Sequence, residues 1–288
     1  MATDGPRYKG VIMGNFDVRP LSPALGAEVV GVDAREPLDP EAAAQLQQLY
    51  DEYHLLLFRD QHVDAEQQER FASTFGPPID DMADGVRTGY ISNVMDDRAG
   101  SGPLPFHADY SFTPLPVQGI VLYAVELPPQ GTSTWYANGA LAAATLPDDL
   151  RREVEGRTAT HTLGTFGPGM EGARTRDHEM SPQAIRYRHP ILRVHPRTGE
   201  TVLFITDLHV EHIDGLDAEA SDRLIDALLE HLYQPAHVYE HRWTVDDFVV
   251  WDNETLQHMR IDISNEKPRS FLRNTLHVAR WSELVPMP

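Results

Sequence analysis

Residues 237–278 have the sequence HVYEHRWTVDDFVVWDNETLQHMRIDISNEKPRSFLRNTLHV, and this stretch decides the fold. It contains three short hydrophobic segments, at 237–243, 248–251 and 271–278, separated by polar residues and by Pro268. Short segments rich in β-branched and aromatic residues and bounded by turn-forming residues predict β-strands. The end of the chain is therefore expected to be mainly β.

Upstream of this stretch the sequence predicts more strands and a few helices. Strands are expected at 54–58, 90–94, 117–127, 191–194 and 202–205. Helices are expected at 40–53, 64–75, 140–150 and 217–233. Early helices, one late helix and many short strands in the second half favour a mainly β fold, a jelly roll or sandwich with flanking helices. No Gly-rich phosphate loop supports a doubly wound α/β sheet.

One domain is expected to span residues 16–288, after a flexible N-terminal tail of residues 1–15. A barrel or sandwich of this length is often a single domain. Two stretches, at about 80–105 and 164–188, are rich in Gly, Pro and charged residues and lack a regular hydrophobic period. We interpret both as loop insertions, because long loops within a compact domain often act as lids.

The composition excludes several classes of protein. Cysteine is absent, so any metal must be held by His, Asp or Glu, and disulfides and thiolate nucleophiles cannot occur. The chain has 24 Lys and Arg against 44 Asp and Glu, a net charge of −20, which argues against nucleic-acid and anionic-membrane binding. With no run of about 18 apolar residues and no signal-like start, a cytoplasmic protein without a membrane span is expected.

A candidate metal site begins with His107-Ala-Asp109. Strand side chains alternate between faces, so residues two apart point the same way and can occupy neighbouring positions on a metal. His258, just after the expected strand at 248–251, is the leading candidate for a third ligand. Two His and one carboxylate form the facial triad of non-haem iron(II) sites, with open positions for a bidentate keto acid and dioxygen. Alone, a His-x-Asp pair is also explained by a histidine bonded to a nearby loop carboxylate.

Arg269 adds a group that a keto-acid co-substrate needs. 2-Oxoglutarate chelates iron through its C1 carboxylate and C2 keto oxygen, which leaves its C5 carboxylate to be anchored elsewhere. A guanidinium can hold a carboxylate bidentately, and the Thr134 hydroxyl could donate to the same group. Without the three metal ligands, Arg269 would be better explained as a solvated charge at a strand edge.

These motifs belong to a longer ordered series that resembles the taurine dioxygenase family, which includes 2,4-dichlorophenoxyacetate dioxygenase. The similarity extends from about Val18 to Val278. The matching segments are LSPALGAEVVGVD (21–33), FRDQ (58–61), FG (75–76), HAD (107–109), GTSTW (131–135), HPILRVHP (189–196), TG (198–199), WDN (251–253), His258, Arg269 and Arg273. The resemblance implies a double-stranded β-helix, a cupin-like jelly roll with flanking helices, in agreement with the strand pattern.

The resemblance also implies roles for individual residues. It implies that His107, Asp109 and His258 bind Fe(II). It implies that Thr134 and Arg269 hold 2-oxoglutarate. The implied activity is that of an iron(II)- and 2-oxoglutarate-dependent dioxygenase, which uses O2 to hydroxylate a small organic substrate and releases succinate and CO2. Hydroxylation at a carbon that bears oxygen, nitrogen or sulfur can lead to cleavage of that bond. A homo-oligomer, dimer or tetramer, would fit the family.

Two departures from the family pattern concern the substrate. Ile79-Asp80-Asp81 stands where the taurine-cleaving enzyme has His residues, and Phe106 stands where it has Trp. A carboxylate there disfavours a sulfonate, so taurine itself is not the expected substrate. Arg273 lies beside the co-substrate in the family and indicates an anionic substrate. The candidate substrate contacts are Asn93, Phe106, Tyr110, Asp81 and Arg273.

Two alternatives from other classes stay open at this point. One is a non-catalytic jelly-roll binding protein, and the other is a zinc hydrolase that uses the same triad. A binding protein does not need all five site residues, and a hydrolase does not need the keto-acid arginine; no His-Glu-x-x-His motif is present. Other histidines are interpreted as structural, with His209 and His212 in a polar loop or short helix and His237 and His241 on an exposed strand face.

Overall fold

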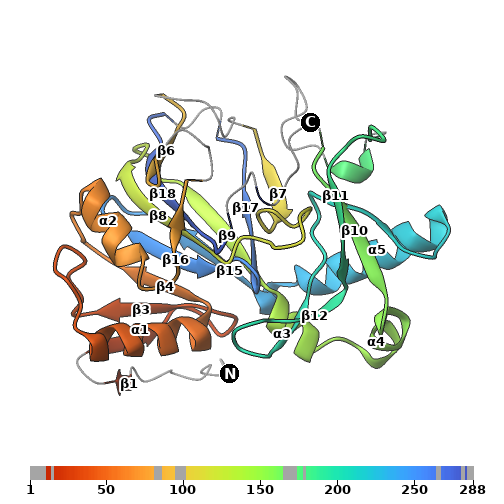
Figure 1. The fold of residues 1–288 in the computed structure, drawn as a ribbon, viewed down its shortest axis with the longest axis horizontal. Coiled ribbons are helices and arrows are strands. Elements are labelled where there is room, and N and C mark those ends of the chain that lie inside the picture. Colours follow the sequence, from red (N-terminus) through yellow and green to blue (C-terminus); the bar gives the residue numbers. More distant parts are fainter. Residues whose placement is uncertain are drawn as a thin grey trace, which may run out of the picture.

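The computed structural model describes residues 11–13, 16–80, 86–94, 102–164, 174–177, 180–263, 267–279 and 283. Most of its regular structure is β-strand, and helices lie outside the main sheets (Figure 1). Two sheets share one hydrophobic interior, as in a double-stranded β-helix. The predicted jelly-roll fold with flanking helices is thus confirmed. Within the described ranges, no helix is long and apolar enough to cross a membrane.

The larger sheet interleaves strands from both ends of the chain. Among the described residues it has nine strands. They are β1 (Val11–Met13), β2 (Phe16–Pro20), β3 (Ala27–Val30), β4 (Leu55–Phe58), β5 (Pro78–Ile79), β6 (Gly89–Ser92), β8 (Gly119–Glu126), β16 (Phe248–Asp252) and β18 (Ser270–Leu276). Their spatial order is β1-β2-β3-β4-β16-β8-β18-β5, with β6 beside β18. All neighbouring strands are antiparallel except β3 and β4, which are parallel. The late strands β16 and β18 each lie between two strands from the first half of the chain.

A four-stranded sheet faces this larger sheet. Its strands are β7 (Leu104–His107), β9 (Ser133–Asn138), β15 (Val238–Arg242) and β17 (Leu256–Arg260), in the order β15-β9-β17-β7. Alternate residues of β4 and β16 point to opposite faces of the larger sheet. The residues facing the smaller sheet are Leu55, Leu57, Val249 and Trp251, which pack with Tyr136 and Leu256. This shared interior is the core of the jelly roll.

Two helices cover the other face of the larger sheet. They are α1 (Pro40–Tyr53) and α2 (Ala65–Ala72). Asp39 caps α1 by accepting from the Ala42 backbone N–H, and Asp64 forms a capping box with Gln67 at the start of α2. The buried residues that join these helices to the sheet include Leu46, Leu49, Phe71, Leu56, Phe58, Phe248 and Val250. The predicted first and second helices are confirmed.

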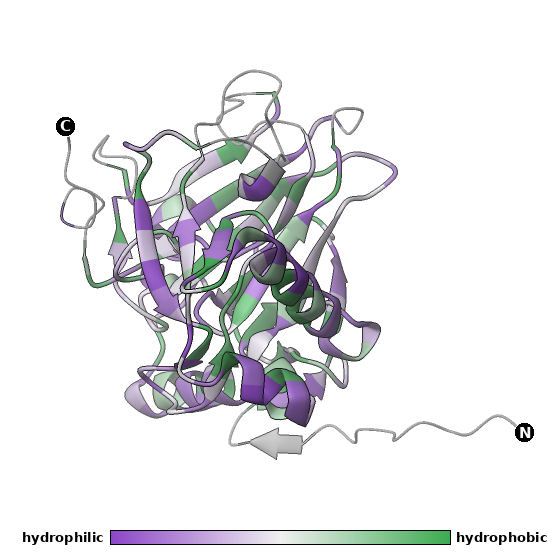
Figure 2. Ribbon diagram, turned by 90° about the vertical axis from the view of Figure 1, so that its right-hand side faces the viewer, coloured by the Kyte–Doolittle hydropathy of each residue, from purple (hydrophilic) through white to green (hydrophobic). Residues whose placement is uncertain are grey.

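A third hydrophobic cluster lies beside the jelly roll. It contains two small sheets, β11-β10-β14 and β12-β13, with three helices. The bounds are β10 (Thr158–Thr162), β11 (Arg186–Pro190), β12 (Leu192–Val194), β13 (Thr201–Leu203), β14 (Val210–Ile213), α3 (Gly139–Ala144), α4 (Asp148–Val154) and α5 (Ala218–Leu232), with 3-10 turns η1 (Thr175–Asp177) and η2 (Pro235–His237). In Figure 2, α5 faces the viewer and carries both hydrophobic and hydrophilic colours, as expected of a helix with one buried face.

Several expected elements differ from those observed. The helix predicted at 140–150 is two helices, α3 and α4, because Pro147 interrupts it. Residues 11–13 of the expected tail form β1, which pairs with β2. His258, expected just after the strand at 248–251, lies within a further strand, β17. The strand β6 falls inside the 80–105 stretch, close to the predicted strand at 90–94.

The structural roles predicted for four histidines were partly wrong. His212 lies on β14 and not in a loop or helix, whereas His209 lies in the turn that directly precedes that strand, as predicted. His237 and His241 are both buried instead of exposed. Burial of each ring is possible because it has a polar partner. His237 bonds Thr145, and His241 lies 3.2 Å from an Asp247 carboxylate oxygen.

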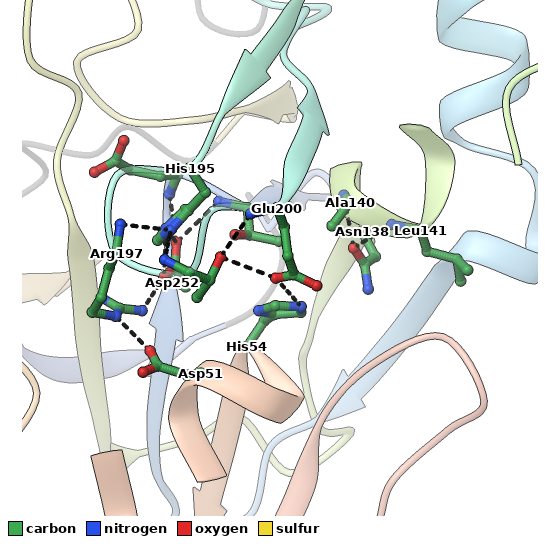
Figure 3. A network of polar contacts seen from close by, with 12 residues as sticks. Asp51, His54, Asn138, Ala140, Leu141, His195, Arg197, Glu200 and Asp252 are labelled. Atoms are coloured by element: carbon green, nitrogen blue, oxygen red, sulfur yellow. Dashed lines mark hydrogen bonds and ion pairs between the residues drawn. The ribbon is translucent and has the colours of Figure 1, made fainter. Parts of the chain in front are cut away.

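A buried ion network fixes the turn between β16 and β17. The Asp252 carboxylate is fully buried and accepts hydrogen bonds from the backbone N–H groups of Glu254 and Thr255, at 2.9 and 3.0 Å. Its other oxygen accepts from His195 and from Arg197, which also pairs with Asp51 on α1 (Figure 3). The turn is therefore tied to both α1 and the β12–β13 loop.

This network predicts an acid-dependent contribution to stability. Burial alone would raise the pKa of Asp252, but the bond from His195 and the charge of Arg197 hold it at about 2. Because the folded pKa lies below the unfolded value of about 3.9, the contribution is present above pH ~4 and is lost as the pH falls toward ~2. Asp252→Asn should lower the free energy of unfolding by about 2 kcal/mol at pH 7, and by less at pH ~3.

Urea unfolding of both proteins at the two pH values measures this difference. Asp51→Asn is the matched control, because it removes a half-exposed partner of the same arginine and should cost no more than about 1 kcal/mol. An equal effect of Asp252→Asn at both pH values would contradict the prediction.

Candidate active site

Three side chains, two on neighbouring strands and one just beyond a strand end, converge at one edge of the smaller sheet. His107 is the last residue of β7 and pairs directly with His258 on β17. Asp109 follows two residues after His107. An oxygen of Asp109 lies 3.4 Å from the His107 Nε2 atom and 4.0 Å from the His258 Nε2 atom. The structure therefore brings together the three residues predicted as metal ligands.

These three atoms have the separations that a shared metal ion requires. All three lie within 4.8 Å of one another. Metal–ligand bonds of about 2.0–2.2 Å place neighbouring donors about 3 Å apart, so small side-chain movements bring them onto one ion. A second group, Asp60, His62 and Asp246, also meets this distance criterion but lies on or near the surface.

The hydrogen bond of His107 leaves the correct nitrogen for a metal. His107 donates from Nδ1 to the Pro105 carbonyl at 2.8 Å, so that its Nε2 atom carries the lone pair that faces Asp109. Such a bond from the second ring nitrogen is typical of metal-ligating histidines. Burial and the neighbouring His107 hold the pKa of His258 well below its usual value, which favours the neutral, metal-binding form.

Asp109 is kept in its charged form. Burial by itself would raise the pKa of its carboxyl, but the positive charge of Arg273 holds this pKa well below its usual range. Arg273 donates to the second carboxylate oxygen at 2.6 Å. One oxygen of Asp109 thus faces the histidines while the other is held by Arg273, as suits a monodentate metal ligand.

A cavity of about 200 Å³ opens beside the three ligands. Its lining combines apolar side chains of both sheets with three arginines, Arg260, Arg269 and Arg273. The apolar residues are Ile91, Leu104, Ile120, Leu122, Trp251 and Met259. An apolar pocket with a few converging charged groups is typical of a small-molecule site, and three guanidinium groups favour anions.

Thr134 and Arg269 line this cavity together. Thr134 on β9 accepts a hydrogen bond from the Trp243 Nε1–H at 2.9 Å, which leaves its own O–H free to donate into the cavity. Arg269 is buried, and its Nε–H donates to the Thr132 hydroxyl at 3.2 Å. A hydroxyl donor and a fixed guanidinium match a carboxylate ligand.

Three of the five residues predicted as substrate contacts are not part of the described cavity lining. Asn93 accepts from the Arg269 backbone N–H at 2.9 Å, and the described lining of the cavity does not include it. Phe106 stacks on Tyr233 with ring centroids 4.3 Å apart, on the side of β7 away from the cavity. Tyr110 is half-buried near His277. Asp81 lies outside the described residues. Of the four members that the structure describes, Arg273 is the one that lines the cavity.

Sequence reasoning missed two residues at this site. Arg260 lines the cavity, and its position two residues after His258 on one strand was the signal that could have revealed it. Asn253 is completely buried and bonds the backbone of Asp109. The motif Trp251-Asp-Asn253 was noted, but no local pattern connects it with residue 109.

Comparison with known proteins agrees with this site. The model of the family described as "Taurine catabolism dioxygenase TauD, TfdA family" matches residues 17–276. The (S)-phenoxypropionate/alpha-ketoglutarate-dioxygenase of Sphingobium herbicidovorans is 35% identical over 265 residues, which cover 84% of this chain and 88% of that protein. The alpha-ketoglutarate-dependent 2,4-dichlorophenoxyacetate dioxygenase of Cupriavidus pinatubonensis is 33% identical, with 85% and 92% covered.

Solved structures show the same similarity. The crystal structure of AAD-2 in complex with Mn(II) and N-oxalylglycine superposes with a TM-score of 0.76 and is 28% identical, covering 91% of this chain and 96% of that chain. The fold and relatives define an alpha-ketoglutarate-dependent (2-oxoglutarate-dependent) dioxygenase. The chain belongs to the TauD/TfdA family. The alternatives of a binding protein and a zinc hydrolase find no support among these relatives.

Proposed function

We propose that this dioxygenase holds Fe(II) on His107, Asp109 and His258 and oxidises a small organic anion. The observation that supports this most directly is the convergence of the three donor atoms beside an arginine-lined cavity. Bound iron(II) in such a site supplies O2 activation coupled to the conversion of 2-oxoglutarate to succinate and CO2. The residues of the chain bind, orient and shield the reactants.

Arg269 and Thr134 anchor the distal carboxylate of 2-oxoglutarate. The Arg269 guanidinium donates to Thr132 and lies over the Phe271 ring, whose centroid lies 4.5 Å from its Cζ atom, and the Arg269 backbone N–H donates to the Asn93 side chain. A guanidinium fixed in this way loses little freedom on binding, so more of its bond energy appears as affinity. The co-substrate is thereby oriented with its keto-acid end toward the metal ligands.

Arg273 and Arg260 lie on the part of the cavity that remains for the substrate. Arg273 already neutralises Asp109, and Arg260 donates to the Gly102 carbonyl at 2.8 Å. The neighbouring apolar side chains suit a hydrocarbon or aryl group attached to an anionic head. Two relatives are named for phenoxypropionate and 2,4-dichlorophenoxyacetate, which have this form. Hydroxylation at an ether carbon of such a molecule leads to C–O cleavage.

An anaerobic titration tests the cofactor assignment. Apo-protein with iron(II) should develop a weak visible charge-transfer band when 2-oxoglutarate is added, because the keto acid chelates the ion. Succinate, which lacks the keto group, is the control and should give no band. Iron binding without a band on addition of 2-oxoglutarate would contradict the proposed co-substrate.

A further inference from the structure

The Asn253 side chain bonds both backbone groups of the metal ligand Asp109. Its Oδ1 atom accepts from the Asp109 N–H at 2.9 Å, and its Nδ2 donates to the Asp109 carbonyl at 3.1 Å. The same Nδ2 donates to the Val117 carbonyl at 2.8 Å. Asn253 is 0% exposed, so water cannot replace any of these three bonds.

Only a carboxamide can make this set of contacts. Asp109 lies beyond the end of β7, where no strand neighbour satisfies its N–H, and the next residue, Tyr110, has a left-handed φ of 59°. The chain therefore turns sharply at the ligand. An amide offers an acceptor and two donors in one plane, as a neighbouring strand would. A carboxylate of the same shape would place an oxygen against two carbonyl oxygens.

The turn that carries Asn253 is itself fixed. The Asn253 backbone N–H donates to the Gln118 carbonyl, and that of Asp252 donates to the His54 carbonyl at 2.8 Å. The Asp252 carboxylate closes the turn and is held by His195 and Arg197 (Figure 3). This turn leads directly into β17, which carries His258.

One rigid turn therefore contacts both halves of the metal site. Through Asn253 it holds the backbone of Asp109, and through β17 it sets the position of His258. We propose that Asn253 is a positioning residue that fixes the separation of the Asp109 and His258 donor atoms and thereby sets the affinity of the site for metal. The proposal rests on the proposed metal site and adds to it a residue that does not itself touch the ion.

Cobalt(II) binding to Asn253 variants tests this proposal. Loss of hydrogen-bonding partners that orient metal ligands typically weakens metal binding about 10- to 100-fold. Asn253→Ala should show a loss of this size in a chelator-competition titration, together with an altered visible spectrum of bound cobalt. Asn253→Asp keeps the shape of the side chain but lacks its N–H donor, so it should show a similar loss of cobalt affinity. This variant replaces Asn253→Ala in the test if the alanine variant does not fold.

Asn138 provides a matched control. Its buried side chain also makes three bonds to the backbone, accepting from Ala140 and Leu141 and donating to Ala24, and it contacts no metal ligand. Asn138→Ala should lower the unfolding temperature without changing cobalt affinity or spectrum.

Two outcomes would overturn the proposal. One is wild-type cobalt affinity in a folded Asn253 variant, and the other is an equal loss of affinity in Asn138→Ala. Failure of the wild-type chain to bind cobalt would instead contradict the metal site itself, so the two failures are distinguishable.

Discussion

In His258→Ala, metal-dependent turnover of 2-oxoglutarate is expected to fall at least about 1,000-fold. The variant keeps His107 and Asp109 but loses the donor supplied by β17, and a metal contributes several kcal/mol to the reaction, each ~1.4 kcal/mol corresponding to tenfold in rate. Metal should also no longer raise the unfolding temperature, because only the folded site of the wild-type chain binds it. Turnover assays and thermal unfolding with and without added iron(II) measure both effects.

His209→Ala is the control for this variant. His209 is also buried, its ring centroid lies 5.9 Å from that of His107, and it bonds the Ser111 hydroxyl at 3.0 Å. It supplies no donor to the predicted metal cluster. Its loss should therefore lower stability through a cavity while metal still stabilises the protein. If His258→Ala binds metal as the wild type does, the assignment of this ligand is wrong.

Arg269→Gln is expected to weaken binding of 2-oxoglutarate by about 2–5 kcal/mol, the range for truncating one partner of a buried, hydrogen-bonded charge pair. This corresponds to about 30-fold or more in the dissociation constant. The charge-transfer titration under anaerobic conditions measures it directly, because the metal ligands are unchanged. Arg269→Lys should recover only part of the affinity, since an ammonium cannot bind a carboxylate bidentately.

Arg273→Gln distinguishes the role of Arg273 from that of Arg269. Arg273 donates to Asp109, so its loss should weaken metal binding more than co-substrate binding, the reverse of the result for Arg269. Wild-type affinity for 2-oxoglutarate in Arg269→Gln would show that another group anchors its distal carboxylate.

The strands that sequence analysis located include central strands of the larger sheet. β4, β8 and β16 have nearly continuous hydrophobic sequences, which is the pattern that predicts a central strand. β9 and β17 were not predicted because Thr134, His258 and Arg260 interrupt their hydrophobic pattern. These polar residues line the cavity. The residues that form the site therefore removed the hydrophobic pattern by which its strands could have been predicted.

The candidate ligands could be chosen from spacing and chemistry, whereas the residues that hold the ligands in place could not. His107 and Asp109 form a local motif, and His258 and Arg269 follow the ordered series. Asn253 acts across 144 positions of sequence, and only the fold reveals its bonds. Strand alternation could have excluded Phe106, because it must point away from the face that carries His107.

The interleaved order of the larger sheet constrains when the proposed metal site can form during synthesis. β4 and β8 leave the ribosome early, yet the strand that joins them, β16, is translated more than a hundred residues later. His258 follows later still, on β17. A nascent chain holding only His107 and Asp109 lacks the donor set and the closed sheet that orients it. The proposed metal site is therefore expected to form only after translation of nearly the whole chain, and a nascent chain that ends before β17 should not be stabilised by iron.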